Sequence, residues 1–253
     1  MTSDQLLTIS VEIGQALLES GAEIYRVEET ISRICMAYGA REVNVYAVPT
    51  VIIASFARGD EPQLTRVCRV RRRGTNLGRI DQLNALSRDA CTGKMDYAAI
   101  RERLELILRR GNYMGWQLCA ATGGTGFFFT LLFGGGPAEA VCSFLCCLAL
   151  WLLTTVMRRM HPNPLFVNVM GGFWVAFSGI LFYHLGLIPS YDTMIVGSIM
   201  PLVPGLSITN SIRDLIAGDS IAGITKFVET LLVAAGIAVG AALMFSIAGF
   251  LGG

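Results

Sequence analysis

The chain has 253 residues, of which 53% are hydrophobic and 15% charged, and its mean hydropathy is +0.55. This hydropathy excludes a single soluble globule, and the charged fraction excludes a chain that lies in a membrane throughout. Charge is also unevenly placed, because residues 1–112 contain 16 of the 20 Lys and Arg and 14 of the 19 Asp and Glu. We therefore expect a water-soluble N-terminal domain followed by a membrane domain. The small net charge predicts no nucleic-acid partner.

The first 112 residues predict a cytoplasmic α+β domain. Apolar residues at helical spacing and runs of Val, Ile and Tyr define its elements. We predict helices over residues 4–20, 22–38, 80–90 and 97–110, and strands over residues 42–48, 50–57 and 64–71. Asp4, Glu12 and Glu19 interrupt the apolar residues at the N-terminus, which argues against a signal peptide. We expect this domain to remain in the cytoplasm.

The second predicted helix has a polar stripe as well as an apolar one. Glu23, Arg26 and Thr30 lie about 110° round the helix from the apolar stripe, at 100° per residue. Such residues are either solvated surface charges or the wall of a cytoplasmic vestibule. We name Glu23, Arg26, Glu28 and Thr30 as the vestibule candidates.

Beyond the first domain, five stretches have the roughly 20 residues that a helix needs to cross a bilayer. They cover residues 114–134, 138–157, 165–187, 190–210 and 228–251. Basic residues gather on the cytoplasmic side of membranes, and Arg158, Arg159 and Lys226 all follow the second or fourth stretch. We therefore predict five transmembrane helices over residues 113–253, with the N-terminus in the cytoplasm and the C-terminus outside.

Cysteine and histidine usage predicts no metal site, cofactor or catalytic centre. The seven cysteines contain no CxxC pair, and both histidines lie beyond the first domain. Cysteines used in this way are small apolar residues that stay reduced. We expect neither a disulfide framework nor a paired nucleophile and base.

Small and polar residues recur on faces of the predicted spans, as in helices that pack closely within a membrane. In the third stretch Asn168 shares a face with glycines, and we name it a candidate for the translocation path. Glu229 begins the fifth stretch near the predicted interface, where snorkelling to water is cheap. It is a second candidate, because Lys226 and Asp219 lie on its side of the membrane.

The fourth stretch carries the strongest local signal, because Pro201, Pro204 and Gly205 fall in mid-membrane. Each proline lacks the N–H that would bond four residues back, so we expect unpaired carbonyls at Gly197 and Met200. Two interpretations remain, a kink satisfied by neighbouring helices and the broken helix of a secondary transporter. The polar residues downstream favour the second. The candidates for substrate binding are Pro201, Pro204, Gly205, Thr209, Asn210, Arg213, Asp214 and Asp219.

Three segments of the chain resemble a known family. They are residues 21–30, GAEIYRVEET; residues 48–50, VPT; and residues 204–205 with 209–219, PG and TNSIRDLIAGD. These segments are similar to those of the threonine/serine exporter family, in particular its YjjP-type N-terminal component. The resemblance covers nearly the whole chain and maps Glu23, Arg26, Glu28, Asn210, Arg213, Asp214 and Asp219 onto the family motifs.

The resemblance implies export of small polar metabolites across the bacterial inner membrane. One branch of the family exports threonine and serine, and another a dicarboxylate such as succinate, driven by ion gradients. Full-length members carry a second membrane half, so the resemblance implies a split form that works with a small YjjB-type membrane protein. A homo-oligomer is left open. The sequence has no GxxxxGK[ST] phosphate loop, which agrees with a transporter that does not use ATP.

Three hypotheses follow from these patterns. The favoured one is an exporter subunit whose path runs beside the broken fourth helix. The alternatives are a membrane-tethered enzyme that uses the polar stripe of the second helix, and a scaffold or sensor subunit. The first domain has no histidine, which argues against the enzyme, and polar residues beside a broken helix argue against a scaffold.

Overall fold

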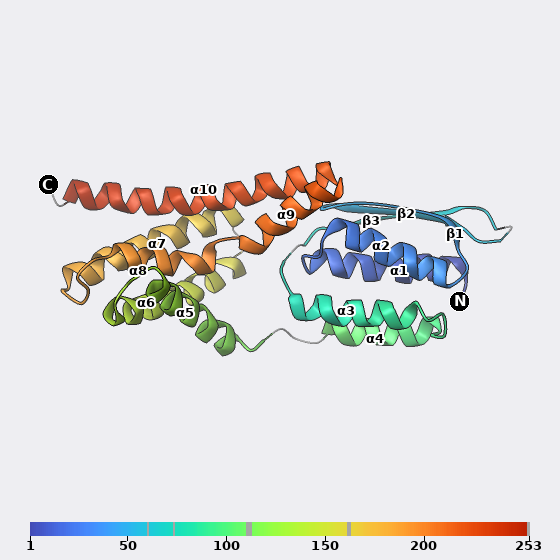
Figure 1. The fold of residues 1–253 in the computed structure, drawn as a ribbon, viewed down its shortest axis with the longest axis horizontal. Coiled ribbons are helices and arrows are strands. Elements are labelled where there is room, and N and C mark those ends of the chain that lie inside the picture. Colours follow the sequence, from blue (N-terminus) through green and yellow to red (C-terminus); the bar gives the residue numbers. More distant parts are fainter. Residues whose placement is uncertain (60, 73, 110–112, 161–162, 252–253) are drawn as a thin grey trace. The chain divides into compact units, whose positions relative to one another are not determined.

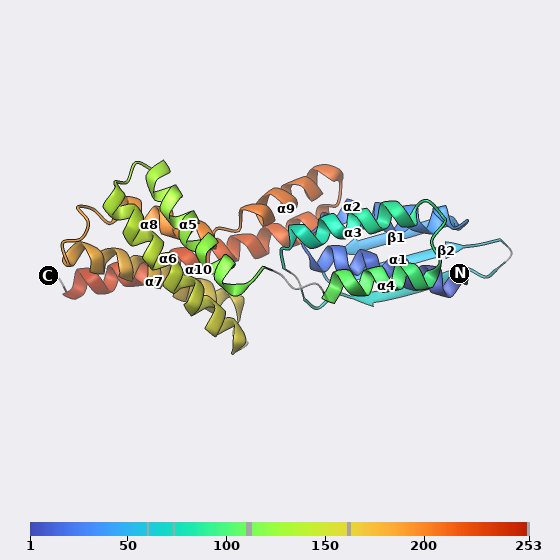
Figure 2. The ribbon, with the colours of Figure 1, turned by 90° about the horizontal axis from the view of Figure 1, so that it is seen from below.

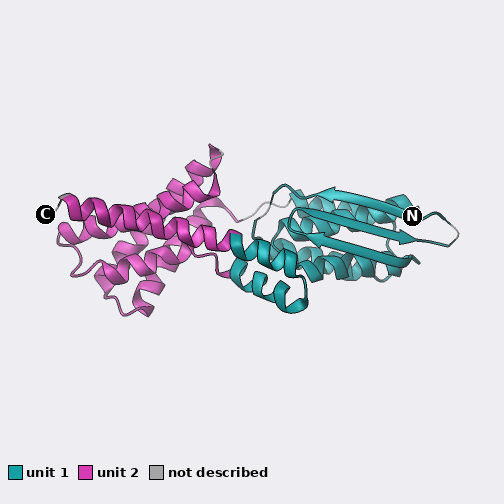
Figure 3. Ribbon diagram, turned by 90° about the horizontal axis from the view of Figure 1, so that it is seen from above, with its two compact units in different colours: residues 1–112, 206–228 teal, residues 113–205, 229–253 magenta. Residues whose placement is uncertain are grey.

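The computed structural model describes residues 1–59, 61–72, 74–109, 113–160 and 163–251. The chain divides into two compact units, drawn in different colours in Figure 3. The first unit contains Met1–Asn112 and Leu206–Val228, and the second contains Tyr113–Gly205 and Glu229–Gly253. Residues 206–228 therefore pack with the N-terminal part of the chain, although most of the second unit precedes them in sequence.

The first unit has three layers (Figures 1 and 2). A three-stranded antiparallel sheet in the order β1-β2-β3 forms one layer, α1 and α2 cover one of its faces, and α3 and α4 pack against the other side of these two helices. The elements are α1 Ser3–Glu19, α2 Ile24–Ala37, β1 Arg41–Val48, β2 Val51–Ala57, β3 Leu64–Arg69, α3 Leu77–Ala90 and α4 Tyr97–Arg109.

Helix α1 is the most buried element because it lies in the middle layer. Leu6, Ile13 and Leu17 are each 0% exposed, as the predicted helical spacing requires. Gly14 allows α1 to approach α2 closely, because a Cβ at this position would lie 2.5 Å from the side chain of Ile31. This close contact between α1 and α2 lies in a core that also contains buried residues of β2, α3 and α4.

The sheet has one covered and one open face. Ile52 and Phe56 point toward the helices and are almost fully buried, as the period of two along a strand predicts. On the other face Ile53 pairs with Tyr46 on β1 and with Val67 on β3, forming one exposed row across the sheet. The three predicted strands are confirmed, with bounds that differ by a few residues.

Helix α9, Gly205–Ala217, and the start of α10, Ser220–Leu251, complete the first unit. The chain turns between them at Gly218, whose φ of +97° is a backbone conformation that glycine adopts without strain. Ala222 of α10 belongs to the core of α1 to α4, whereas Ile216 and Ile221 remain 83% and 65% exposed. Helix α9 buries Ser211 and Asp214 and exposes Ile216, so its polar face is turned inward and its apolar face outward, which suits an apolar surrounding.

The second unit is a bundle of helices that contact closely through glycines. It contains α5 Gly115–Leu132, α6 Pro137–Arg159, α7 Pro164–His184, α8 Asp192–Ile199, the short 3₁₀ helix η1 Met200–Leu202 and the remainder of α10. A Cβ on Gly172 of α7 would overlap the carbonyl of Ile237, and a Cβ on Gly240 of α10 would overlap the carbonyl of Val169. Backbones in this contact approach too closely for any other residue.

The predicted fold class, an α+β domain followed by five transmembrane helices, is wrong. Helices dominate both units and the sheet has only three strands among the described residues. By length and composition, three described helices can cross a membrane, or up to four if the bent pair α8–η1 and α9 is one span. The three are Pro137–Arg159, Pro164–His184 and Ser220–Phe250.

Two of the five predicted spans account for the difference. Residues 114–134 form α5, in which Gln117, four glycines and three threonines dilute the apolar side chains. Residues 190–210 are divided by a break at Val203 and Pro204. The fifth predicted span, residues 228–251, is the C-terminal part of a longer helix that begins at Ser220.

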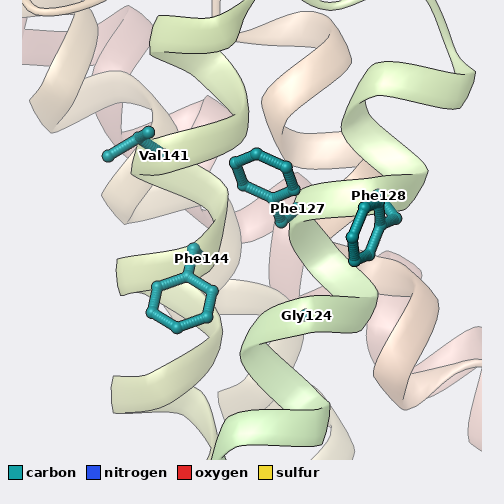
Figure 4. Close-up of a pocket in the computed structure, with 5 residues that line it drawn as sticks. All are labelled: Gly124, Phe127, Phe128, Val141 and Phe144. Carbon is teal, nitrogen blue, oxygen red and sulfur yellow. The ribbon is translucent and has the colours of Figure 1, made fainter.

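A pocket of about 330 Å³ lies between α5 and α6 in the second unit (Figure 4). Its lining residues are Gly124, Phe127, Phe128, Val141 and Phe144. Gly124 has no side chain and none of the other four side chains can form a hydrogen bond, so the pocket does not suit a polar metabolite.

Candidate functional site

A cluster of charged and polar side chains lies where α9 meets the turn between α1 and α2, within the first unit. It contains the backbone groups of Gly21 and Ile24 and the side chains of Glu23, Arg26, Asn210, Arg213, Asp214 and Lys226. The residues at 210, 213 and 214 share one face of α9, because positions three and four apart are neighbours on a helix. We refer to this group as the α9 cluster.

Asp214 is the buried centre of the α9 cluster. Its side chain is 0% exposed, and its Oδ2 accepts from Lys226 Nζ at 2.7 Å. Its Oδ1 accepts from the backbone N–H of Ile24 at 3.1 Å. Ile24 is the first residue of α2, whose own N-cap, Glu23, forms no capping hydrogen bond. Asp214 therefore caps α2 from another helix, where a negative charge is favoured by the helix dipole.

Glu23 joins α2 to α9 by a second contact. Its carboxylate lies between Arg213 of α9 and Arg26, whose Nε is 3.3 Å from Glu23 Oε2. The Glu23 side chain is only 10% exposed, whereas that of Arg213 is 49% exposed. One buried carboxylate is thus shared by two guanidinium groups that reach toward solvent.

Asn210 supplies a third contact of α9, to the turn between α1 and α2. Its Nδ2 donates to the carbonyl of Gly21 at 3.0 Å. Gly21 has a φ of +91°, and a Cβ there would lie 2.8 Å from the carbonyl of Gly74. Glycine is therefore required at the position that presents this carbonyl to Asn210.

Glu28 and Asp219 form a second acidic pair in the same unit. Glu28 Oε1 accepts from the backbone N–H of Ala47 on β1 at 2.7 Å. Burial raises the pKa of the Glu28 carboxyl, and the charge of Asp219 raises it further. Burial and the charge of Asp214 likewise raise the pKa of Asp219, against the opposing effect of Lys226. Asp219 also lines a pocket of about 300 Å³ between β1 and the start of α10.

The break in the fourth predicted span is satisfied locally. Pro201 and Pro204 remove two helical donors as predicted, but the N–H of Met200 bonds the carbonyl of Gly197, and the N–H of Val203 bonds that of Met200 at 3.2 Å. The expectation of unpaired carbonyls is therefore wrong, because a 3₁₀ turn supplies donors three residues along. Val203 is extended, with ψ of 124°, as a residue before proline prefers.

Most of the other predicted site residues belong to the second unit, whereas the α9 cluster belongs to the first. Pro201, Pro204, Gly205, Asn168 and Glu229 belong to the second unit. Asn168 lies against α10, since its Cβ would be 3.4 Å from a Cβ on Gly236. Thr30 is buried in α2 and Thr209 is exposed on α9.

Sequence reasoning missed that Lys226 is the partner of Asp214. It placed Lys226 with Glu229 and Asp219, on the grounds that all three share one side of the membrane. The signal that could have found the pair is the short turn at Gly218, because two helices joined by such a turn lie side by side. Contacts of α9 with the α1–α2 turn have no comparable signal, since about 190 residues separate the partners.

Replacing Asp214 by Asn should destabilise the first unit. The amide is neutral and removes the charge that faces the ammonium group of Lys226, whose side chain is only 15% exposed, and this loss costs roughly 3 kcal/mol and lowers Tm by about 5–10 °C. Thermal unfolding of the purified protein measures this change. The control is Asp81→Asn on α3, an exposed carboxylate whose loss should shift Tm by less than about 1 °C. Equal Tm values for the two variants would contradict the role of Asp214.

Replacing Glu28 by Gln should stabilise the protein at neutral pH. A raised pKa means that the folded state holds the proton more tightly, so this group's contribution to stability is full below its ordinary pKa of 4.5 and is lost as pH rises through the raised value. Glutamine retains the acceptor for Ala47 and carries no charge. The Tm of Glu28→Gln should exceed that of the parent at pH 7, and the difference should vanish near pH 4. The exposed Glu102→Gln should show no such pH-dependent gain.

Comparison with known proteins gives the chain a family. A family model described as "Putative threonine/serine exporter" matches residues 8–248. The chain is 25% identical to a threonine/serine exporter of Corynebacterium glutamicum over 94% of its own length and 50% of the exporter's. It is 23% identical to a probable threonine/serine exporter of Mycobacterium tuberculosis, over 93% of its own length and 45% of that protein's.

The match to a third relative covers almost the whole length of both proteins. This relative is the probable succinate transporter subunit YjjP of Escherichia coli, 23% identical over 96% of the chain and 95% of the relative. The chain thus spans about half of the two exporters and almost all of YjjP. No solved structure matches it. Since the family match covers nearly every residue, this chain belongs to the threonine/serine exporter family.

Proposed function

We propose that this chain is a subunit of a secondary exporter of small polar metabolites in the bacterial inner membrane. The observation that carries the proposal is the helix break between η1 and α9, in a bundle of apolar helices of a chain that belongs to an exporter family. Broken helices near the membrane midplane are where secondary transporters place their substrates. Family membership identifies a transporter rather than an enzyme.

The substrate that we propose is a small metabolite with a carboxylate. The relatives are named for threonine and serine or for succinate, all of which are small, polar and carry at least one carboxylate. An ion gradient is the proposed energy source, because the sequence has no phosphate loop. The paired carboxylates of Glu28 and Asp219, with their raised pKa values, are candidates for a coupling proton.

Within this function the α9 cluster is proposed to position α9 at the cytoplasmic side of the path. Both carboxylate oxygens of Asp214 are engaged, which favours a positioning role over direct contact with substrate. The side chains of Arg213 and Arg26 are 49% and 39% exposed, and both remain candidates for a vestibule that attracts carboxylates. Asn210, Thr209 and Glu23 complete the proposed cytoplasmic entrance.

A second subunit is part of the proposal. The curated relative from Escherichia coli is named a transporter subunit, and so is its counterpart from Klebsiella aerogenes. We propose that the partner is a small YjjB-type membrane protein. We also propose a cytoplasmic N-terminus and an external C-terminus, which reporter fusions at Gly74 and at the C-terminus test; a reporter that is active outside at Gly74 would contradict this orientation.

Export by the complex tests the proposal directly. Cells that express this chain together with a YjjB-type protein should lose preloaded serine, threonine or succinate faster than cells that express either protein alone. An uncoupler of the ion gradient should remove the difference. A chain that serves only as a scaffold or an enzyme would leave all three export rates at the level of the control cells.

Replacing Pro204 by Ala tests the role of the break. The variant restores an N–H and frees Val203 to become helical, so we expect Tm to stay equal or rise while export falls severalfold. Thermal unfolding and the export assay measure the two effects. The matched control is Pro189→Ala, in the segment between α7 and α8, which should leave both properties unchanged. Parental export by Pro204→Ala would show that the break is not needed for transport.

A further inference from the structure

A small pocket in the second unit lies directly beside the helix break. Its volume is about 170 Å³, and α5, α6 and η1 all line it. Its lining includes Thr122, Trp151, Thr154, Arg158, Pro201 and Leu202. Pockets for drug-sized ligands occupy about 300–1,000 Å³, so this one suits a much smaller molecule.

Arg158 gives this pocket its charge. It lies in the last turn of α6, is exposed, and forms no ion pair among the residues that the structure describes. A guanidinium with free donors binds a carboxylate through two parallel hydrogen bonds. The neighbouring Arg159 is equally placed to orient the chain in a membrane, but it does not line the pocket.

The threonine hydroxyls add acceptors. Thr122 Oγ1 donates to the carbonyl of Leu118 at 2.8 Å, and Thr154 Oγ1 donates to that of Leu150 at 2.9 Å. Because each hydroxyl donates its hydrogen to a carbonyl of its own helix, its lone pairs remain available to a ligand in the pocket. Trp151 adds an aromatic wall, held against Gly115 of α5, where a Cβ would lie 3.4 Å from the indole. Hydroxyl lone pairs and an indole face both attract an ammonium group.

The wall formed by the break is anchored. Leu202, which follows Pro201, lies against Gly171 of α7, where a Cβ would be 3.0 Å from its side chain. It also packs on the buried cluster that contains Leu150. The pocket is therefore built from a fixed 3₁₀ turn on one side and from α5 and α6 on the other.

We infer that this pocket is a binding subsite for the carboxylate of a small metabolite, with Arg158 as its anion-binding residue. The inference rests on the proposed export function and deepens it, by naming residues that contact the substrate. A molecule with a carboxylate at Arg158 and an ammonium at the threonines satisfies both ends of the pocket. Thr122 and Thr154 would present lone pairs, not donors, to a second carboxylate.

Equilibrium binding to the full-length purified protein in nanodiscs tests the subsite. The probes are radiolabelled serine, threonine and succinate. The parent and Arg159→Gln should bind at least one of them with Kd values within about twofold of each other, whereas Arg158→Gln should bind it roughly tenfold or more weakly. Arg158→Lys should recover part of the affinity, since it keeps the charge but loses the paired donors.

A further variant distinguishes an amino acid from a dicarboxylate as the molecule that supplies the carboxylate. Thr154→Val removes an acceptor, so it should weaken binding of serine or threonine and leave any binding of succinate unchanged. Equal affinity of the parent and Arg158→Gln, equal losses in Arg158→Gln and Arg159→Gln, or a parent that binds none of the probes would each overturn the subsite. Export by the parent complex is measured separately. A complex that still exports while the subsite fails leaves the proposed function intact, and a complex without export removes it.

Discussion

The carboxylate of Asp214 is the constraint on which the first unit depends. A charge with no exposed surface is stable only when it is paired and hydrogen-bonded, and its partners come from two further helices, α2 and α10. Each partner fixes one direction of approach. Ile24 sets where α9 meets the start of α2, and Lys226 sets how α10 returns after the turn at Gly218. Glu23 and Asn210 add two further contacts between α9 and the region where α1 passes into α2.

The two longest family-like segments of the sequence contact one another. Residues 21–30 contain the turn and helix start that receive α9, and residues 209–219 contain the side chains that reach them. The first explanation for the residues of both segments is therefore structural, because they form the contact between α9 and the start of α2. This arrangement also accounts for the reversed amphipathic character of α9, which buries Asp214 and exposes Ile216. Its polar face docks within the unit, and its apolar face is suited to a lipid or interfacial surrounding.

The helices of the second unit are held together in a different way, because they are apolar on nearly every side. Close contact rather than hydrophobic burial must hold such helices together, and glycines at 172 and 240 allow α7 and α10 to touch through their backbones. Polar groups inside the unit are satisfied nearby, as in the hydrogen bond between Ser143 and Ser198 at 2.8 Å. The proline break follows the same rule, since a 3₁₀ turn bonds the carbonyls that the prolines would leave free. An interruption of this kind can persist in a membrane without a ligand.

The sequence alone determined the division between a charged and an apolar part, the helices and strands of residues 1–109, and the position of the break at Pro204. These features follow from local periodicity, turn residues and the missing N–H of proline, which act over a few positions. Only the tertiary structure decided that residues 206–228 belong with the N-terminal unit, that Asp214 caps α2, and that α5 and α6 place Thr122 and Arg158 beside η1. Each of these depends on which distant faces meet. The residues that meet, such as Ile24 and Asp214, can be 190 positions apart in the sequence, and no local pattern encodes which of them will form a contact.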